Sequence, residues 1–133
     1  MYNLGISCYY HDSAAAILKD GHVIAAVEEE RFSRKKFDDG FPNMAIDWCL
    51  QEAGIRPEQI DSVAFYDKPV LKFDRLLDNY ITVAPRGLYS FLDIIPKWLH
   101  KRLWIEDDIK KHLKGFKGEI IFPEHHMSHA AYA

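Results

Sequence analysis

Three histidines close together near the end of the chain have a spacing that suits metal binding: His125, His126 and His129. They follow a run rich in β-branched and aromatic residues at 119–122, which reads as a buried strand that Pro123 ends. Residues 130–133 favour a helix, so we expect one to begin near Glu124. On that helix His125 and His129 are four residues apart and lie on one face. Two imidazoles at this spacing can converge on one metal ion, as in H-E-x-x-H helices, whereas His126 points about 100° away. The alternative is that these histidines are polar surface or capping residues.

A polar turn near the start of the chain is a second candidate site. Tyr10, His11, Asp12 and Ser13 lie between two predicted strands. Such a turn can present backbone N–H groups and a side chain to a phosphate. The alternative is a hairpin turn that binds nothing, which is the case for most turns of this kind.

A charged run at 28–36 follows the third predicted strand. Four basic side chains in it suit the phosphate oxygens of a ligand, and Lys35 is the one assigned to a binding site. The four are Arg31, Arg34, Lys35 and Lys36. Glu29 and Glu30 in the same run are expected on a solvated surface.

The apolar pattern predicts the strands and helices that would position these residues. Strands are expected at 4–9, 14–19, 23–28, 62–66 and 119–122. Asp20-Gly21 predicts a hairpin between the second and third strands, because glycine adopts positive φ readily. An amphipathic helix with apolar residues at 46, 49, 50 and 53 is expected to end at Gly54. A mainly helical stretch at about 70–114 is expected either to leave apolar surface that meets another part of the protein or a second copy, or to close a core of its own.

The order of these elements indicates a fold class. Three antiparallel strands, a helix, a strand, a helical stretch, a strand and a helix follow one another, which is the order of the ribonuclease-H-like α/β fold of actin and the hexokinases. We therefore expect a truncated half-domain with a five-stranded mixed sheet in the order 3-2-1-4-5. Strands one, four and five are then parallel neighbours, so the turn at 10–13 and the helix at 125–129 leave the same edge of the sheet. Ligands of open α/β sheets bind at that edge, so the two signals predict one site.

Composition restricts the class of protein. Hydrophobic residues make up 48% and charged residues 28% of the 133 residues, as in globular domains rather than disordered chains. The net charge of -3 gives no electrostatic support for nucleic-acid binding, and no apolar run is long enough to span a membrane. The first residues lack a secretory pattern, and Cys8 and Cys49 are expected to be reduced and buried, so we expect a cytoplasmic protein. The helix-favouring end at 130–133 has no stop signal, which favours an N-terminal piece of a longer protein.

Six motifs spread over nearly the whole chain resemble the N-terminal part of the carbamoyltransferases that modify nodulation factors and antibiotics. They are LGIS at 4–7, YHDSAA at 10–15, EEERFSRKK at 28–36, GFP at 40–42, YDKP at 66–69 and EHHMSHAA at 124–131. The resemblance implies an ATP-dependent O-carbamoyltransferase whose separate C-terminal domain makes carbamoyl adenylate from carbamoyl phosphate and ATP. The N-terminal domain then passes the carbamoyl group to a hydroxyl of a small-molecule acceptor beside a bound iron.

The resemblance also implies roles for individual residues. His125 and His129 match the metal-binding histidine pair, and His11 matches a candidate base for the acceptor hydroxyl. Tyr10, Asp12 and Ser13 would line the same turn as ligand-binding residues. Spacing cannot name the metal, so zinc and manganese are alternatives to iron, and further carboxylate ligands would lie beyond residue 133. Without those ligands and the C-terminal domain, residues 1–133 alone are expected to lack the complete reaction; a homodimer is a further expected partner.

Two other functions fit the same pattern. One is a nucleotide- or metal-binding module without transfer activity, part of an ATPase of the actin or hexokinase type. The other is transfer of threonylcarbamoyl to tRNA, against which the acidic balance and the lack of a basic stripe argue. Acceptor-dependent release of AMP would separate the enzyme from the module.

Overall fold

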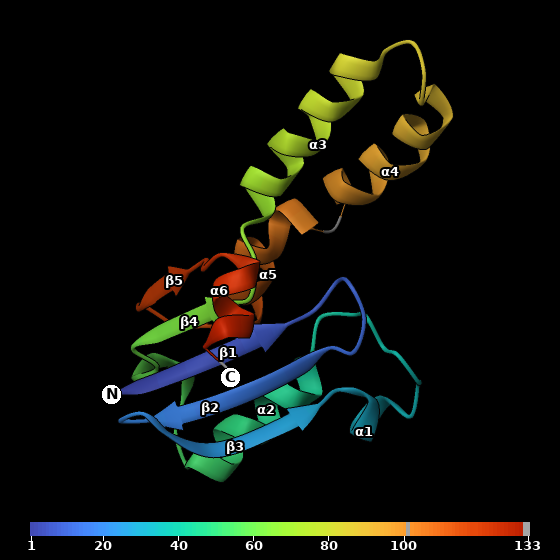
Figure 1. Ribbon diagram of the computed structural model, residues 1–133. Helices are drawn as coiled ribbons and strands as arrows, with labels where there is room; N and C mark the ends of the chain where they lie inside the picture. Colours follow the sequence, from blue (N-terminus) through green and yellow to red (C-terminus); the bar gives the residue numbers. More distant parts are fainter. Residues whose placement is uncertain (101, 132–133) are drawn as a thin grey trace.

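Five strands form one mixed sheet in the order β3-β2-β1-β4-β5 in the computed structural model, which describes residues 1–100 and 102–131 (Figure 1). The strands are β1 (Tyr2–Ser7), β2 (Ala14–Lys19), β3 (His22–Glu28), β4 (Ser62–Phe65) and β5 (Glu119–Ile121). β1 pairs antiparallel with β2 and parallel with β4, and β4 pairs parallel with β5. The predicted fold class and strand order are therefore confirmed.

The hairpin between β2 and β3 was predicted correctly, whereas the end of β1 was not. The β2–β3 hairpin turns at Asp20 and Gly21, whose φ values of 51° and 83° are those that a tight hairpin turn requires. β1, in contrast, ends two residues earlier than expected. Tyr9 has a left-handed backbone with φ 67°, and its N–H donates to the carbonyl of Asp39 at 2.8 Å. The chain has therefore already left the sheet at Tyr9.

One face of the sheet carries the hydrophobic core. Leu4, Ile17 and Val63 point into it from three neighbouring strands and are fully buried. The helices α2 (Asn43–Ala53) and α5 (Ile105–His112) cover this face (Figure 1). α2 ends at Gly54, which has the left-handed φ of 65° expected of a glycine that ends a helix.

The opposite face of the sheet carries small side chains and is covered at one side by α6 (His125–Ala130) (Figure 1). α6 begins directly after Glu124, as predicted. The predicted helical end at 130–133 lies partly outside the described residues, because the description stops at Ala131.

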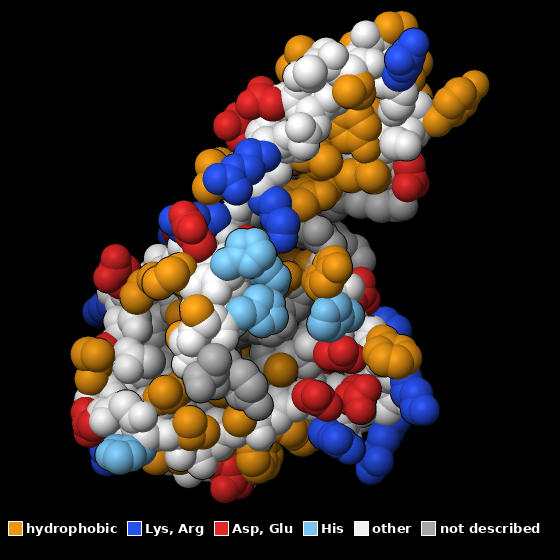
Figure 2. Space-filling model, in the orientation of Figure 1, with side chains coloured by type: hydrophobic (Ala, Val, Ile, Leu, Met, Phe, Trp, Pro, Cys, Tyr) orange, Lys and Arg blue, Asp and Glu red, His pale blue; other side chains and the backbone are white. Residues whose placement is uncertain are grey.

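The stretch predicted to be mainly helical forms a helical hairpin of α3 (Pro69–Val83) and α4 (Leu88–His100), followed by the short 3-10 helix η2 (Arg102–Trp104). The helical hairpin extends away from the sheet (Figure 1), and hydrophobic side chains gather between its two helices (Figure 2). The rings of Tyr80 and Phe91 pack edge to face there, with centroids 5.3 Å apart. Pro96 lies inside α4 and does not end it. Apolar side chains nevertheless stay exposed on the helical hairpin, among them Ile81 and Tyr89.

None of the helices formed by residues 1–100 and 102–131 combines the length and the apolar character needed to cross a membrane.

The charged run at 28–36 folds differently from the prediction. It contains a short helix, α1 (Glu30–Ser33), and Glu29 just before it is 4% exposed. The carboxylate of Glu29 accepts hydrogen bonds from the N–H groups of Met44 at 3.2 Å and Ala45 at 2.7 Å. These belong to the first turn of α2, where Pro42 at the N-cap supplies no side-chain acceptor. The prediction that Glu29 lies on a solvated surface is wrong, because the start of α2 needs this carboxylate.

Candidate active site

The ends of β1 and β4, the loop after β1 and α6 enclose a cavity of about 400 Å³. Its lining residues are Ser7, Tyr10, His11, Tyr66, His125, Ser128 and His129. The first turn (residues 10–13) and the imidazole pair (His125 and His129) therefore border one cavity, as the predicted strand order requires. Figure 2 shows histidine side chains gathered on this face of the molecule near α6.

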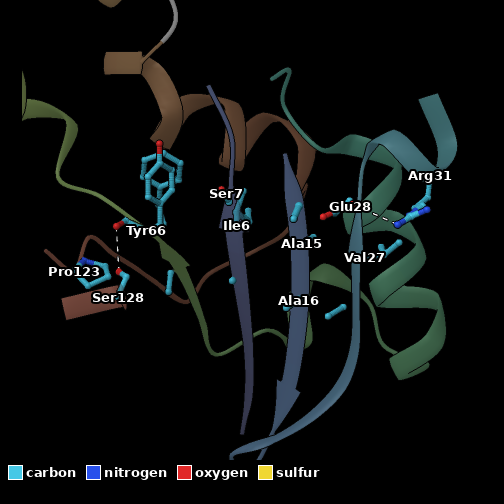
Figure 3. Close-up of a pocket in the computed structure, with 15 residues that line it drawn as sticks. Ile6, Ser7, Ala15, Ala16, Val27, Glu28, Arg31, Tyr66, Pro123 and Ser128 are labelled. Carbon is cyan, nitrogen blue, oxygen red and sulfur yellow. Dashed lines mark hydrogen bonds and ion pairs between the residues drawn. The ribbon is translucent and has the colours of Figure 1, made fainter. Parts of the chain in front are cut away.

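Side-chain contacts fix α6 to the end of β4. The hydroxyl of Ser128 donates to the backbone carbonyl of Tyr66 at 3.1 Å, and the close-up shows the two residues facing each other (Figure 3). Lys68 Nζ also lies 3.6 Å from Glu124 Oε1, which joins the start of α3 to the N-cap of α6. The ring of Tyr66 packs edge to face on His125, with centroids 5.6 Å apart. The sheet edge thus sets the position of the imidazole pair.

The two imidazoles of the pair face each other through one nitrogen each. The Nε2 atoms of His125 and His129 are 3.2 Å apart, and the ring planes stand at 90°. Two nitrogen ligands about 2.0–2.1 Å from one tetrahedral ion would be about 3.3 Å apart, so the pair has a separation suited to one ion. His125 Nδ1 is buried and has no hydrogen-bond partner within the described part of the chain. His126 is exposed, and it does not belong to the cavity lining.

The surroundings of His125 favour its neutral form. Burial, followed by the charges of His129 and Lys72, lowers the pKa of His125 below its ordinary value, and Asp67 acts in the opposite direction. Neutral imidazole is the form that binds a metal. Over residues 1–100 and 102–131, no group of three or more His, Cys, Asp or Glu side chains is placed to hold a metal ion. The imidazole pair therefore fits as two ligands, and further ligands would have to come from elsewhere.

The first turn is held at both ends by the loop at 38–40. The backbone N–H groups of Tyr9 and Ser13 donate to the carbonyls of Asp39 and Asp38 at 2.8 and 2.7 Å. The hydroxyl of Ser13 donates to the carbonyl of Gly40 at 2.5 Å. Ser13 is buried and is not among the residues that line the cavity, so its contacts anchor the turn.

Between these anchors, the turn presents aromatic and polar side chains. The ring centroids of Tyr10 and His11 are 4.7 Å apart, and both residues line the cavity. Asp12 does not line it, but its Oδ2 lies 3.0 Å from Nδ1 of His11. His11 and Tyr10 therefore line the same cavity as the imidazole pair, whereas Asp12 contacts His11 from outside that lining.

Lys35 is not brought to this cavity. Its Nζ lies 3.3 Å from Asp38 Oδ1 and 3.7 Å from Asp39 Oδ1, in the loop that holds the first turn. Hydrogen bonds from Ser33 and from the Gly40 N–H, with Lys35 as a smaller contribution, lower the pKa of the Asp38 carboxyl. A ligand would have to compete with these two carboxylates for Lys35.

Three cavity residues were not assigned from the sequence: Ser7, Tyr66 and Ser128. Ser7 ends β1, and Tyr66 directly follows β4. Both positions lie at the carboxyl ends of neighbouring parallel strands, which is the signal that could have identified them. Ser128 could not be identified in this way, because its contact with Tyr66 depends on how α6 lies against the sheet.

A wider groove of about 830 Å³ lies beside the cavity on the open face of the sheet (Figure 3). Small side chains line it, because Gly5 pairs with Ala16 on one side and Ala64 on the other. Arg31, one of the predicted cations, lies at its rim with its guanidinium 3.8 Å from the carboxylate of Glu28. The open face thus presents little side-chain bulk next to the candidate active site.

Comparison with known proteins identifies a matching family and similar proteins. The profile of a family described as "Carbamoyltransferase N-terminus" matches residues 2–133. An uncharacterised protein of Synechocystis sp. is 49% identical over an alignment of 137 positions that covers 98% of this chain and 22% of that protein. The nodulation protein NolNO of Sinorhizobium fredii is 47% identical over an alignment of 125 positions that covers 92% of this chain and 17% of that protein. The chain thus spans about a fifth of the length of these relatives.

Proposed function

The chain belongs to the carbamoyltransferase family, and we propose that the longer protein transfers a carbamoyl group to a hydroxyl of a small-molecule acceptor in the cavity beside the first turn. The observation that supports this proposal is that Tyr10, His11 and the imidazole pair line one cavity. An alcohol is a poor nucleophile at neutral pH, so a histidine within reach of the hydroxyl meets the main chemical need of the reaction.

His11 is the proposed base in the transfer step. The acceptor hydroxyl gives its proton to a ring nitrogen of His11 while its oxygen forms a bond to the carbamoyl carbon of carbamoyl adenylate. The bond between that carbon and the phosphate oxygen breaks, and AMP leaves with the electron pair. The products are the O-carbamoylated acceptor, AMP and protonated His11. The side chain of His11 is 65% exposed, so it can return the proton to solvent.

The carbamoyl donor comes, in this proposal, from another part of the longer protein, which converts carbamoyl phosphate and ATP to carbamoyl adenylate. The first turn would then receive the adenylate together with the acceptor. Tyr10 lies on the cavity side of the turn, where its ring can contact a ligand.

The imidazole pair would hold a divalent metal, with iron as the proposed ion and zinc or manganese as alternatives. When bound, such an ion would polarise the carbamoyl carbonyl and neutralise phosphate charge. This chain contributes the four-residue spacing on α6 that brings the two Nε2 atoms together, surroundings that favour the neutral form of His125, and the contact of Ser128 with Tyr66 that holds α6 at the cavity.

Turnover of the longer protein tests the base. The protein is given ATP, carbamoyl phosphate and a panel of sugar and aminoglycoside acceptors, and AMP and carbamoylated product are measured. His11→Asn should lower kcat by about a hundredfold or more and leave bound metal unchanged. His22→Asn, at the exposed β2–β3 hairpin, is the matched control. Equal turnover of the two variants would remove His11 from the mechanism.

Metal content tests the imidazole pair separately. The longer protein is incubated with Fe(II), Zn(II) or Mn(II), washed, and analysed for bound metal. His125→Ala should lose most of the metal, whereas His126→Ala, the exposed neighbour outside the cavity, should retain it. Retention of metal by His125→Ala would contradict the ligand assignment. Nucleotide binding without acceptor-dependent AMP release would instead favour a non-catalytic binding module.

A further inference from the structure

A carboxylate stands directly behind His11 and takes no part in the transfer step described above. Asp12 Oδ2 lies 3.0 Å from Nδ1 of His11. A carboxylate can only accept a hydrogen bond, so the neutral imidazole must carry its proton on Nδ1 and its lone pair on Nε2. We propose that Asp12 is a positioning residue that holds His11 in this tautomer and so makes Nε2 the atom that accepts the hydroxyl proton.

The contact between these two adjacent residues depends on the backbone of the turn. In a strand, neighbouring side chains point to opposite faces and do not meet. Asp12 has a left-handed backbone with φ 36°, a conformation that Asp tolerates better than most residues. The hydrogen bonds of Tyr9 and Ser13 to the loop at 38–40 hold the turn in this shape. The fold of the turn, rather than chance contact of two free side chains, therefore brings the carboxylate to the imidazole.

The rest of the surroundings of His11 agree with this arrangement. The side chain of Asp12 is 38% exposed and that of His11 65%, so solvent screens much of the charge attraction between them. The main effect of the carboxylate is then the choice of ring nitrogen that carries the proton. Tyr10 packs against the ring at a tilt of 51°, and His11 rather than Asp12 lines the cavity with the imidazole pair.

A second histidine–aspartate pair in the chain provides an internal reference. His112 Nε2 lies 2.9 Å from Asp47 Oδ1, so this carboxylate faces the other ring nitrogen. By the same argument the neutral ring of His112 carries its proton on Nε2. The two histidines should therefore show opposite tautomers in one spectrum.

The inference rests on the proposed function only for the identity of the proton donor, and the tautomer can be measured without turnover. Long-range ¹H–¹⁵N NMR of the ¹⁵N-labelled chain at about pH 8, where imidazoles are neutral, reports which ring nitrogen carries the proton. We expect the Nδ1–H form for His11 and the Nε2–H form for His112. Asp12→Asn should shift His11 toward the Nε2–H form and leave His112 unchanged. Asp47→Asn, the matched control, should affect His112 alone.

The same two variants are then compared in the longer protein. Asp12→Asn should lower kcat about tenfold with little change in the KM of the acceptor, whereas Asp47→Asn should retain full turnover. Asn also tolerates the left-handed backbone, so the variant should fold, which its thermal unfolding midpoint checks. A wild-type His11 in the Nε2–H form, or a tautomer unchanged in Asp12→Asn, would overturn the inference. A shifted tautomer with unchanged kcat would support the positioning by Asp12 and instead reject His11 Nε2 as the base.

Discussion

Glu29 connects the candidate active site to the core, and its replacement gives a sharp test of how the first turn is supported. Its backbone N–H donates to the carbonyl of Ser13 at 2.8 Å, and its buried carboxylate accepts from the N–H groups of Met44 and Ala45 at the start of α2. Glu29→Ala would remove the carboxylate and leave both N–H groups without this acceptor. The start of α2 would then lose its cap while the backbone contact with the turn remained.

The magnitude follows from these two hydrogen bonds. A hydrogen bond to a charged group contributes about 1.5–3 kcal/mol, and loss of a helix cap costs about 0.5–2 kcal/mol. Because water can partly replace the carboxylate at the helix terminus, we expect Glu29→Ala to lower the free energy of unfolding by about 2–4 kcal/mol. With an m-value of about 2 kcal/mol/M in urea, the midpoint should fall by about 1–2 M. Glu29→Gln keeps one acceptor oxygen and should lose about half as much.

Glu30→Ala is the matched control, because it removes the neighbouring carboxylate. Glu30 accepts a long hydrogen bond of 3.4 Å from the N–H of Phe37 and should contribute less than about 0.5 kcal/mol. Urea unfolding followed by circular dichroism, with unchanged m-values, gives the comparison. Midpoints of Glu29→Ala and Glu30→Ala that agree within error would refute the capping role of Glu29.

Three further predictions concern the core, a close backbone approach and the thiols. Ile109→Ala should lower the free energy of unfolding by about 2–4 kcal/mol in urea unfolding, because Ile109 is fully buried on α5; a loss below about 1 kcal/mol would contradict its place in the core. Gly118→Ala should lower the thermal unfolding midpoint, because a Cβ at Gly118 would overlap the carbonyl oxygen of Asp61; an unchanged midpoint would contradict that close approach. Burial raises the pKa of the Cys8 thiol and raises that of Cys49 to about 11, so neither should react with Ellman's reagent until urea unfolds the chain; rapid reaction of the folded chain would contradict this burial.

The parts of the fold that depend on local pattern were predicted from the sequence. The hairpin at Asp20 and Gly21, the end of α2 at Gly54 and the strand order all follow from turn residues, helix-ending residues and element order. The errors lie where a residue meets a partner distant in sequence. Glu29 reads as surface in a charged run, and only the approach of α2, which begins at Asn43, makes it a buried cap.

In the candidate site, too, the features set by local spacing were predicted, and those that depend on contacts with other segments were not. The spacing of His125 and His129 within one helix was enough to bring their Nε2 atoms together. The placement of Lys35 and Ser13 was not predictable, because it depends on how the loop at 38–40 lies against the first turn. The contact of His11 with Asp12 was also hidden, since nothing in the letters of two adjacent residues specifies a left-handed φ.

The attachment of the first turn to the loop at 38–40 has a consequence for protein engineering. The carbonyls of Asp38, Asp39 and Gly40 hold the turn through three hydrogen bonds, so the two segments form one mechanical unit although 25 or more positions separate them along the chain. In a chimera that takes only the turn from a relative, the new turn would have to form its hydrogen bonds with the original loop at 38–40, to which it is not matched. Grafts of the first turn should therefore carry both segments together.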